Sequence, residues 1–388
     1  MKLQVHFKNL FLALVMGSLI GFSVVSFFKS LFWIQNFQGT HSHYILLLPV
    51  VWLVLKFIKR TTLYFPVTVS ETYNTTPVTF RHWNKLSFLF NFVGSVLSHF
   101  SGASIGREGV VITLSAGIAQ VFNLDWNYWR VIVISAGFGV AMANPFVGVV
   151  FLYEVFTSKM NQKLLTFLTT WIGCLIAQSF QIPVLIEPFF VLGVNSFSEK
   201  LFFVLVAGGL IGLASRIYKA AFFKLKNHFD KSSIWLTAII LVIVSIILYQ
   251  PQFKDFHSLS LSAFKLLPTG QITAEFIFYK FLITLFFVSV GFWGGEFVPS
   301  VLIGSGLGIV LAKYFSIDPT FGLMLGSFSF FCGLTNLKWT ALVLTGLLVG
   351  FHQLIWVYLF LTVCRWFAGR ASVYTTEPSA YNNFWAKF

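Results

Sequence analysis

Long apolar runs recur along the whole chain, and charged residues are largely confined to the short stretches between them. A helix needs about 20 apolar residues to cross the hydrocarbon core of a membrane. Hydrophobic residues make up 57% of the 388 residues and charged residues only 10%, whereas soluble domains average roughly 45–50% and 25%. Soluble classes are therefore excluded. The chain is predicted to be an all-α, polytopic membrane protein, with apolar runs at 8–29, 43–58, 84–99, 108–122, 130–142, 145–156, 164–180, 200–223, 233–249, 273–290, 298–313, 319–333 and 338–368.

Several runs, such as 108–122 and 145–156, are shorter than a membrane span. Short apolar segments interrupted by glycine or proline survive at membrane depth only when protein buries them or when they line a cavity. Two glycine-rich turns, SGASIGREGVVITLSAG at 101–117 and GFWGGEFVPSVLIGSGLG at 291–308, follow apolar helices in corresponding positions of the two halves. A matched pair of interruptions is typical of transporters built from repeats. We therefore predict broken or re-entrant helices arranged as two inverted-topology repeats.

The domain organisation follows from the same pattern. We expect a single transmembrane domain over 1–388, with repeat one at about 8–180 and repeat two at about 200–376. The stretch 181–199 would link the repeats, and the hydrophilic stretch 250–272 would form a loop outside the membrane. No soluble regulatory domain is expected.

Each glycine-rich turn has the chemistry of an anion site. A helix that begins in the turn presents N–H groups without intrahelical partners and the positive end of its dipole, which together favour a bound anion. Glycines let the backbone turn and let an ion approach closely. Glu108 and Glu296 lie inside these turns, where a carboxylate costs roughly 2.5–3.5 kcal/mol on membrane-insertion scales. The residues thus predict either helix-capping carboxylates or groups that gate an anion path or handle protons.

The formal charge of +14 comes from 26 Lys and Arg residues against 12 Asp and Glu residues. The basic residues gather mostly in short loops, as at Lys224 and Lys226, which is typical of cytoplasmic loops and interfacial anchors. Nucleic-acid binding is therefore not predicted, and a positive field is compatible with an anion path. The three cysteines show no metal-binding spacing, so neither a metal nor an organic cofactor is expected. We expect a multi-pass location in a plasma or inner membrane, with lipid as a partner.

The two turns resemble signature motifs of the CLC family of voltage-gated chloride channels and proton-coupled anion antiporters. That family carries G-K/R-E-G-P in its first half and G-G-x-F-x-P in its second, and this chain reads GREGV at 106–110 and GGEFVP at 294–299. The segment 137–156 resembles the family's glycine- and alanine-rich segment, and GRASVYTT near the C-terminus resembles the segment that supplies its pore tyrosine. The resemblance runs in the right order from about residue 84 to 376.

This resemblance implies anion transport by a homodimer with a separate pore in each protomer. It implies that Glu108 is the gating glutamate, whose side chain occupies the anion path and swings away when protonated. It also implies that backbone amides of Phe297 and Val298 coordinate the anion and that Tyr374 donates its hydroxyl, a neutral donor that holds an anion without trapping it. The other expected anion-binding positions, from both turns and an early serine, are Gly106, Arg107, Gly109, Val110, Gly295, Glu296 and Ser70.

Some positions depart from the family pattern. The early G-S-G-I-P motif is absent from 67–74, where Ser70 is the candidate replacement for its coordinating serine. Val155 stands where proton-coupled members carry a second glutamate, as in many channel members. Val110 in place of proline, and Glu296 in the second motif, resemble the fluoride-exporting branch, which couples fluoride to protons without that second glutamate. The sequence leaves three questions open: whether the ion is chloride or fluoride, whether the protein is a channel or an antiporter, and whether the altered early motif binds an anion.

Two alternatives accompany the transport hypothesis. The residues 102–106 fit G-x-S-x-G, the nucleophile elbow of serine hydrolases, which needs a preceding strand and both His and acidic partners. An apolar helix precedes it here, so a membrane-embedded hydrolase that uses Ser104 is disfavoured and the chain is predicted not to be an enzyme. A CLC-like scaffold that no longer conducts is the other alternative, because the early motif is lost.

Overall fold

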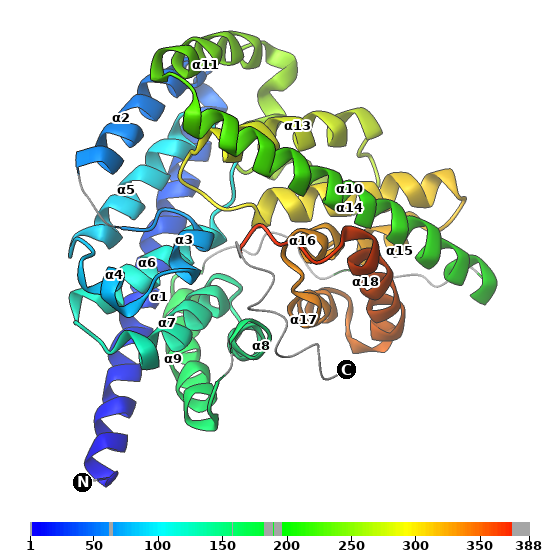
Figure 1. Cartoon of the computed structure of the whole chain (residues 1–388). Helices are drawn as coiled ribbons and strands as arrows, with labels where there is room; N and C mark the ends of the chain where they lie inside the picture. The colour runs from blue at the N-terminus through cyan, green and yellow to red at the C-terminus, as the bar shows by residue number, and fades with distance from the viewer. Residues whose placement is uncertain (1, 62–64, 157, 182–188, 190–195, 375–388) are drawn as a thin grey trace. The chain divides into compact units, whose positions relative to one another are not determined.

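The computed structural model describes residues 2–61, 65–156, 158–181, 189 and 196–374, with the backbone alone for residues 2–6. These residues form helices and turns, with no β-strand among them (Figure 1). They fall into two compact units. Unit 1 comprises Met1–Gly102, Arg107–Pro183 and Trp293–Gly295, and unit 2 comprises Ala103–Gly106, Val184–Phe292 and Glu296–Phe388. Each unit therefore includes a short segment from the opposite half of the sequence, taken from a glycine-rich turn.

The described part of unit 1 is a bundle of α-helices of very unequal length. These are α1 Lys2–Thr40, α2 Leu48–Thr61, α3 Val69–Tyr73, α4 Pro77–Arg81, α5 Ser87–Phe100, α6 Glu108–Val121, α7 Trp126–Ala141, α8 Pro145–Val155 and α9 Met160–Ser179, with a 3₁₀ turn, η1, at His43–Leu47. At about 1.5 Å per residue, the 14 residues of α6 fall short of the roughly 30 Å hydrocarbon core. Short helices of the predicted kind are thus present.

Small residues bring the helices of unit 1 into close contact. Gly17 and Gly21 of α1 face α9, where a Cβ added to Gly21 would lie 2.9 Å from the carbonyl oxygen of Gly173. Such small-residue contacts allow helices to pack tightly where no hydrophobic effect drives their association. The start of α8 is fixed by Asn144, whose side chain accepts the backbone N–H of Phe146 at 2.9 Å ahead of a proline at the first helical position.

The described part of unit 2 is also helical. Its helices are α10 Phe197–Lys231, α11 Ile234–Leu248, α12 Leu261–Leu266, α13 Ala274–Val290, α14 Phe297–Tyr314, α15 Pro319–Gly326, α16 Ser329–Thr335, α17 Lys338–Val349 and α18 Leu354–Ala368, with 3₁₀ turns η2 at Pro251–Phe256 and η3 at Phe351–Gln353. The GxxxG pair Gly304 and Gly308 of α14 packs directly on Gly326 and Gly322 of α15. These glycines therefore serve close helix packing.

Some apolar runs are divided more finely than their composition predicts. The run 338–368 is two helices, because Gly350 takes a left-handed φ of 83° between α17 and α18. The run 319–333 breaks between α15 and α16. The predicted loop at 250–272 contains η2 and α12. Most of the predicted linker at 181–199, and the residues after 374 in repeat two, lie outside the described residues.

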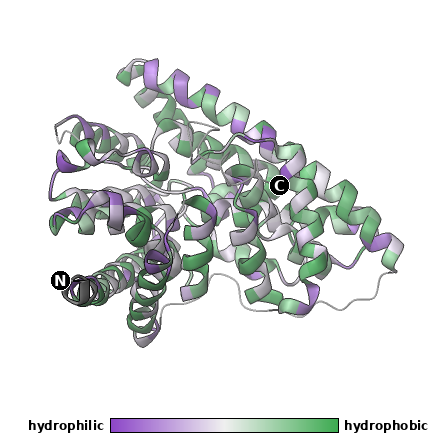
Figure 2. Ribbon diagram, turned by 60° about the horizontal axis from the view of Figure 1, so that its bottom comes forward, coloured by the Kyte–Doolittle hydropathy of each residue, from purple (hydrophilic) through white to green (hydrophobic). Residues whose placement is uncertain are grey.

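Hydrophobic residues dominate the helices, and hydrophilic residues gather mainly at helix ends and connections (Figure 2). Four described helices are long and apolar enough to cross a membrane, namely Phe7–Thr40, Phe197–Lys231, Phe297–Tyr314 and Phe351–Ala368. Shorter apolar helices accompany them in both units. The fold thus combines spanning helices with helices too short to span.

Candidate anion gate and binding site

The first glycine-rich turn leads from α5 into α6. Gly102 takes a left-handed conformation, with φ of 86°, that a side chain would strain. α6 then begins at Glu108 with Arg107 as its N-cap residue. The first backbone N–H groups of a helix have no intrahelical acceptor, and here the N–H of Val111 is the first to donate back, to the Arg107 carbonyl at 3.4 Å. The turn therefore places the positive N-terminal end of α6 next to Glu108, the first residue of that helix.

Glu108 is buried and pairs with the residue before it. Arg107 Nε lies 3.0 Å from Glu108 Oε1, and these side chains are only 5% and 1% exposed. The guanidinium also stands 3.8 Å from the centroid of the Phe28 ring on α1, a cation–π contact that holds it in place. Glu108 Oε2 is buried without a hydrogen-bond partner among the described residues. The second carboxylate oxygen can therefore accept a further hydrogen bond.

Parts of both turns meet inside unit 1. A Cβ added to Gly109 would lie 3.0 Å from the Cα of Gly295, so Gly109 has no room for a side chain unless a neighbour shifts. Trp293 fixes the second segment, because its ring packs on Gly94 of α5 and its backbone N–H donates to Ser98 Oγ at 3.1 Å. Gly109 and Gly295, both predicted on the anion path, are thus brought together at the start of α6.

The second turn opens α14 in unit 2. Glu296 occupies the N-cap position, yet its side chain accepts no capping hydrogen bond, and Ser300 N–H donates to its backbone carbonyl at 2.9 Å. Glu296 is half-buried and forms no ion pair among the described residues. Lys226 of α10 contributes positive charge from beyond ion-pair distance. This glutamate therefore differs from Glu108, which has an arginine beside it.

Tyr374 lies in unit 2 with Phe297. The two rings flank Phe331, whose centroid is 4.8 Å from that of Phe297 and 6.4 Å from that of Tyr374. Tyr374 is only 2% exposed, and its backbone N–H donates to Ser372 Oγ at 3.1 Å. The structure thus places the predicted hydroxyl donor one aromatic ring from the start of α14.

The early segment reaches the first turn despite its missing glycines. Ser70 is the second residue of α3, where it is half-buried, and Thr68 caps this helix by accepting the N–H of Glu71 at 3.1 Å. The side chain of Val69 would lie 3.0 Å from a Cβ on Gly109. α3 therefore lies against the start of α6. The remaining predicted positions, Gly106, Val110 and Val298, are all buried.

Lys280 is a residue that sequence reasoning missed. It is fully buried on α13, and its Nζ donates to Ser104 Oγ and Ser260 Oγ at 2.7 Å each, with the carbonyls of Phe256 and Ser258 at 3.3 and 3.4 Å. It forms no ion pair with a described carboxylate. Lys280 therefore fastens Ser104 of the first turn, and the 256–260 loop, onto α13. A lone lysine inside an apolar run is costly, and that cost was the available signal.

The same contacts remove the hydrolase alternative. Ser104 follows a helix and an irregular segment instead of the strand that a nucleophile elbow needs. Its hydroxyl bonds to Lys280 and, at 2.8 Å, to Thr284 Oγ1, and it contacts neither a histidine nor a carboxylate among the described residues. Ser104 therefore anchors the chain and does not form a catalytic triad.

Comparison with known proteins identifies the family. A sequence profile described as voltage gated chloride channel matches residues 81–369, well over half of the chain. The chain belongs to the voltage-gated chloride channel (CLC) family. This confirms the resemblance carried by the two glycine-rich turns. CLC proteins are channels or transporters and not enzymes.

Individual CLC relatives agree with this assignment. A chloride/fluoride channel protein from Pseudomonas syringae pv. tomato is 26% identical over 283 residues, a match that covers 66% of this chain and 61% of the relative's length. The crystal structure of a CLC-type fluoride/proton antiporter superposes with a TM-score of 0.80 at 23% identity, over 95% of this chain and 97% of that one. A slow cyanobacterial Cl⁻/H⁺ antiporter gives a TM-score of 0.79 at 18% identity, over 98% of both chains. The predicted all-α, polytopic CLC fold is thereby confirmed.

Proposed function

We propose that this CLC protein carries chloride or fluoride across a membrane in exchange for protons, with Glu108 as the gate. The observation that carries the proposal is the buried Glu108 carboxylate at the N-terminus of α6, with one oxygen on Arg107 and the other without a donor. An ion pair with a purely structural role gains no stability from leaving Glu108 Oε2 without a hydrogen bond. A gating side chain, in contrast, must be held weakly enough to move out of the anion path. The fluoride/proton antiporter and the chloride/fluoride channel among the relatives support this choice of ions.

The gate works through competition for the positive end of α6. While ionised, Glu108 places its negative charge at the start of that helix, where a dissolved anion would otherwise bind. A proton removes the negative charge, weakens the attraction to Arg107 and leaves the first N–H groups of α6 to an arriving anion. Gly106 and Gly109 permit close approach to this backbone, and Val110 follows in the first turn of the helix.

The second turn supplies the other donors. Backbone N–H groups of Phe297 and Val298 at the start of α14 bind the anion, with Gly295 giving close access to the backbone. Tyr374 adds a neutral hydroxyl, and Ser70 adds a further hydroxyl at the start of α3. Glu296, which has no ion-pair partner among the described residues, carries protons to and from this region. The proposal includes a homodimer in a plasma or inner membrane, each protomer with its own pathway.

Fluoride is the first ion to test. Val110 and Glu296 match the fluoride-exporting pattern, and fluoride appears in the names of two relatives. The purified chain would be reconstituted into liposomes loaded with fluoride or chloride, and efflux would be followed with ion-selective electrodes under an imposed pH gradient. Liposomes without protein give the leak rate for each ion.

Each result selects one mechanism. Uphill fluoride movement driven by protons supports the proposed antiport, and the same result with chloride assigns the other ion. Passive chloride flux that moves no protons would show a channel and refute the coupling. Flux of neither ion above the leak rate would leave the non-conducting scaffold as the correct description.

A further inference from the structure

Tyr218 carries a hydroxyl that the fold buries without a hydrogen bond. The residue lies in the second half of α10 and is only 1% exposed, and its hydroxyl has no hydrogen-bond partner among the described residues. Most buried tyrosines place the O–H against a partner, because an unsatisfied polar group is costly in a protein interior. The Tyr218 hydroxyl can therefore donate a hydrogen bond to an acceptor that moves into reach.

Aromatic packing holds the Tyr218 ring in place. The ring meets Phe281 of α13 edge-on, with centroids 5.1 Å apart and planes at 88°, and it meets Phe330 of α16 in the same manner at 5.7 Å and 87°. Edge-to-face pairs of this kind add to the stabilisation that burial gives. Within unit 2, α10 packs against α13, α14 and α16 (Figure 1). An acceptor must therefore come to the hydroxyl, because the ring itself is fixed.

Glu296 is the carboxyl group that acts on this hydroxyl. Its charge interacts with the Tyr218 phenol inside unit 2. α16 links the two positions, because Phe330 contacts the tyrosine ring and the next residue, Phe331, contacts the ring of Phe297 at 4.8 Å between centroids. Glu296 accepts no capping hydrogen bond at the start of α14, and the backbone donor near its carboxylate is its own N–H. Among the described residues, no hydrogen bond or ion pair ties this side chain to another helix, so it can turn towards Tyr218.

The same face of α10 also carries a cation. Lys226 lies eight residues after Tyr218, with Phe222 halfway between them, and residues spaced by four lie on one side of a helix. The ammonium of Lys226 stands 5.7 Å from the centroid of the Phe222 ring, and its charge attracts Glu296 from beyond ion-pair distance. The aromatic residues that face Tyr218 from α13 and α16 carry no charge. The hydroxyl and the ammonium that act on Glu296 thus come from one face of α10.

We propose that Tyr218 is a positioning residue for Glu296. Its hydroxyl donates a hydrogen bond to the ionised carboxylate when that side chain turns from the start of α14 towards α10. This inference rests on the proposed role of Glu296 in carrying protons. A phenol is a neutral donor, so it stabilises the ionised form of Glu296 without the permanent pairing that an arginine gives to Glu108. Glu296 can therefore release a proton while it faces Tyr218 and take one up again when it turns away.

The test compares Tyr218→Phe with Tyr279→Phe in the purified full-length chain. Both substitutions remove one hydroxyl and keep the ring, and Tyr279 of α13 is 36% exposed and packs its ring on Phe253 and Phe256. Anion efflux from liposomes and proton movement would be recorded together between pH 5 and 8. Without its donor, the ionised form of Glu296 is less stable, so the carboxyl group keeps its proton to higher pH. In Tyr218→Phe we expect the pH midpoint of the protons moved per anion to rise by about one pH unit, the shift that one hydrogen bond to a charged group gives. Tyr279→Phe should keep the wild-type midpoint.

Infrared spectroscopy tests the hydrogen bond without transport. Acidifying the protein in detergent produces a C=O band from each carboxyl group that gains a proton, and the band lost in Glu296→Gln belongs to Glu296. Tyr218→Phe should raise the titration midpoint of this band by the same amount as the flux midpoint. Tyr218→Phe/Glu296→Gln should behave like Glu296→Gln in both measurements, because the hydroxyl then has no carboxylate to act on. The Tm of Tyr218→Phe should equal or exceed that of the wild type, because the hydroxyl that it removes has no partner among the described residues.

The outcomes separate this inference from the proposed function. An unchanged midpoint of the Glu296 band in Tyr218→Phe would refute the hydrogen bond. A large fall in the Tm of that variant would show that the hydroxyl has a structural partner instead, and would refute it as well. An effect of Tyr218→Phe that persists beside Glu296→Gln would mean that the hydroxyl acts elsewhere. If the wild type moves no protons while the band shifts as expected, the hydrogen bond stands and the transport role of Glu296 fails.

Discussion

The two glycine-rich turns carry one glutamate each, but they hold it in different ways. Glu108 is buried on an adjacent arginine, which itself stacks on Phe28. Glu296 is half-buried at the N-cap of α14 and forms no ion pair among the described residues. The two turns have similar sequences, but their glutamates therefore need not have the same function. The first arrangement suits a gate whose charge is held until a proton arrives, and the second suits a carboxylate that exchanges its proton readily.

The largest effect is expected from Glu108→Gln, which fixes the gate in a mimic of its protonated state. We expect the pH dependence of anion flux to disappear and its rate to change by roughly tenfold or more, the factor that about 1.4 kcal/mol of barrier height gives. Flux from proteoliposomes between pH 5 and 8 measures this. Glu71→Gln is the matched control, because Glu71 pairs with Lys59 at 2.7 Å on the exposed surface. Wild-type rate and pH dependence in Glu108→Gln would break the gate assignment.

Arg107→Met tests the counter-ion that distinguishes the first turn. Removing one partner of a buried ion pair typically costs about 3–5 kcal/mol, because the other charge is left without compensation. We expect a large drop in Tm, and flux that is activated by protons at higher pH than in the wild type. Lys59→Met removes one partner of an exposed pair and should cost at most about 1 kcal/mol.

A double variant separates the charge from the packing. Arg107→Met/Glu108→Gln leaves no orphan carboxylate, so it should recover much of the stability that the single arginine variant loses. If the double variant is no more stable than Arg107→Met, the arginine acts through its contact with Phe28 and not through the ion pair.

Gly109→Ala tests the contact between the first turn and Gly295. The new methyl group would meet Gly295 Cα and Val69 Cγ2 at 3.0 Å each, and overpacking of this kind costs typically about 1–3 kcal/mol. Gly39→Ala in α1 is the control, since nothing lies within 4 Å of a Cβ there. Thermal unfolding of both variants gives the comparison. Equal Tm values would mean that the two segments separate easily and that the close approach is not a constraint.

The sequence alone was enough to predict the membrane class, the two turns and the family, because these depend on local composition and on short motifs. GREG and GGEF mark the helix starts at Glu108 and Phe297, and both helices begin there. The break at Gly350 was missed because a glycine inside an apolar run is compatible with either a helix or a kink. Its left-handed φ reflects the packing that follows and not the local pattern.

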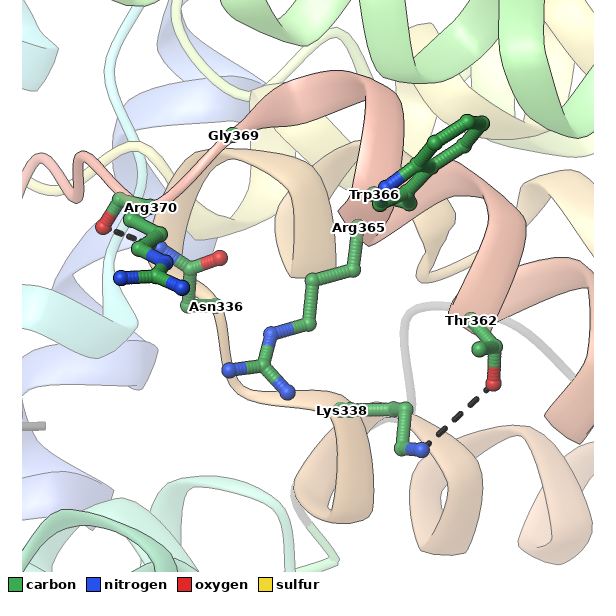
Figure 3. A pocket seen from close by; sticks show the side chains of 7 residues that line it. All are labelled: Asn336, Lys338, Thr362, Arg365, Trp366, Gly369 and Arg370. Carbon is green, nitrogen blue, oxygen red and sulfur yellow. Dashed lines mark hydrogen bonds between the residues drawn. The ribbon is translucent and has the colours of Figure 1, made fainter. Parts of the chain in front are cut away.

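Contacts between residues distant in sequence could not be predicted. The residues around Lys280 in the sequence do not predict that its ammonium donates to Ser104, which lies 176 positions earlier in the chain. The sequence likewise could not predict that Glu108 Oε2 lacks a hydrogen-bond partner among the described residues, because this depends on which donors the fold places around the carboxylate. A pocket in unit 2 likewise collects Lys338, Arg365 and Arg370 from three separate elements (Figure 3). Such sites emerge only when the helices have been packed.

Glu296→Gln is the counterpart of the Glu108 variant in the second turn. The Glu296→Gln substitution leaves no described cation without its ion-pair partner. We therefore expect the free energy of unfolding to fall by less than about 1 kcal/mol, with a correspondingly small change in Tm. Anion flux should persist while the protons moved per anion fall, since a glutamine cannot carry a proton. Simultaneous recording of pH and anion efflux measures that ratio. A loss of stability as large as that of Arg107→Met would contradict the distinction drawn between the turns.

The smallest effect concerns the contact between Lys280 and the first turn. Lys280 holds Ser104 on one side and the 256–260 loop on the other. In that loop, burial lowers the pKa of His257 to about 4, and the positive charge of Lys280 adds to this shift, although the backbone carbonyl of Leu248 opposes it. The closed loop therefore keeps His257 neutral, whereas an opened loop binds a proton near the ordinary pKa of about 6.5.

Opening of the loop should thus become easier as pH falls from about 6.5 towards 4, and the stabilisation should be complete above that window. Hydrogen exchange of amides in 250–262, corrected for the intrinsic pH dependence, should accelerate by roughly several-fold between pH 7 and 5. His257→Gln removes the titrating group and should abolish this pH dependence. The amides of Trp293–Gly295 in the second turn are the internal reference, because this segment has no titratable side chain. If both segments accelerate together, acid acts on the whole protein and the effect is not specific to the loop.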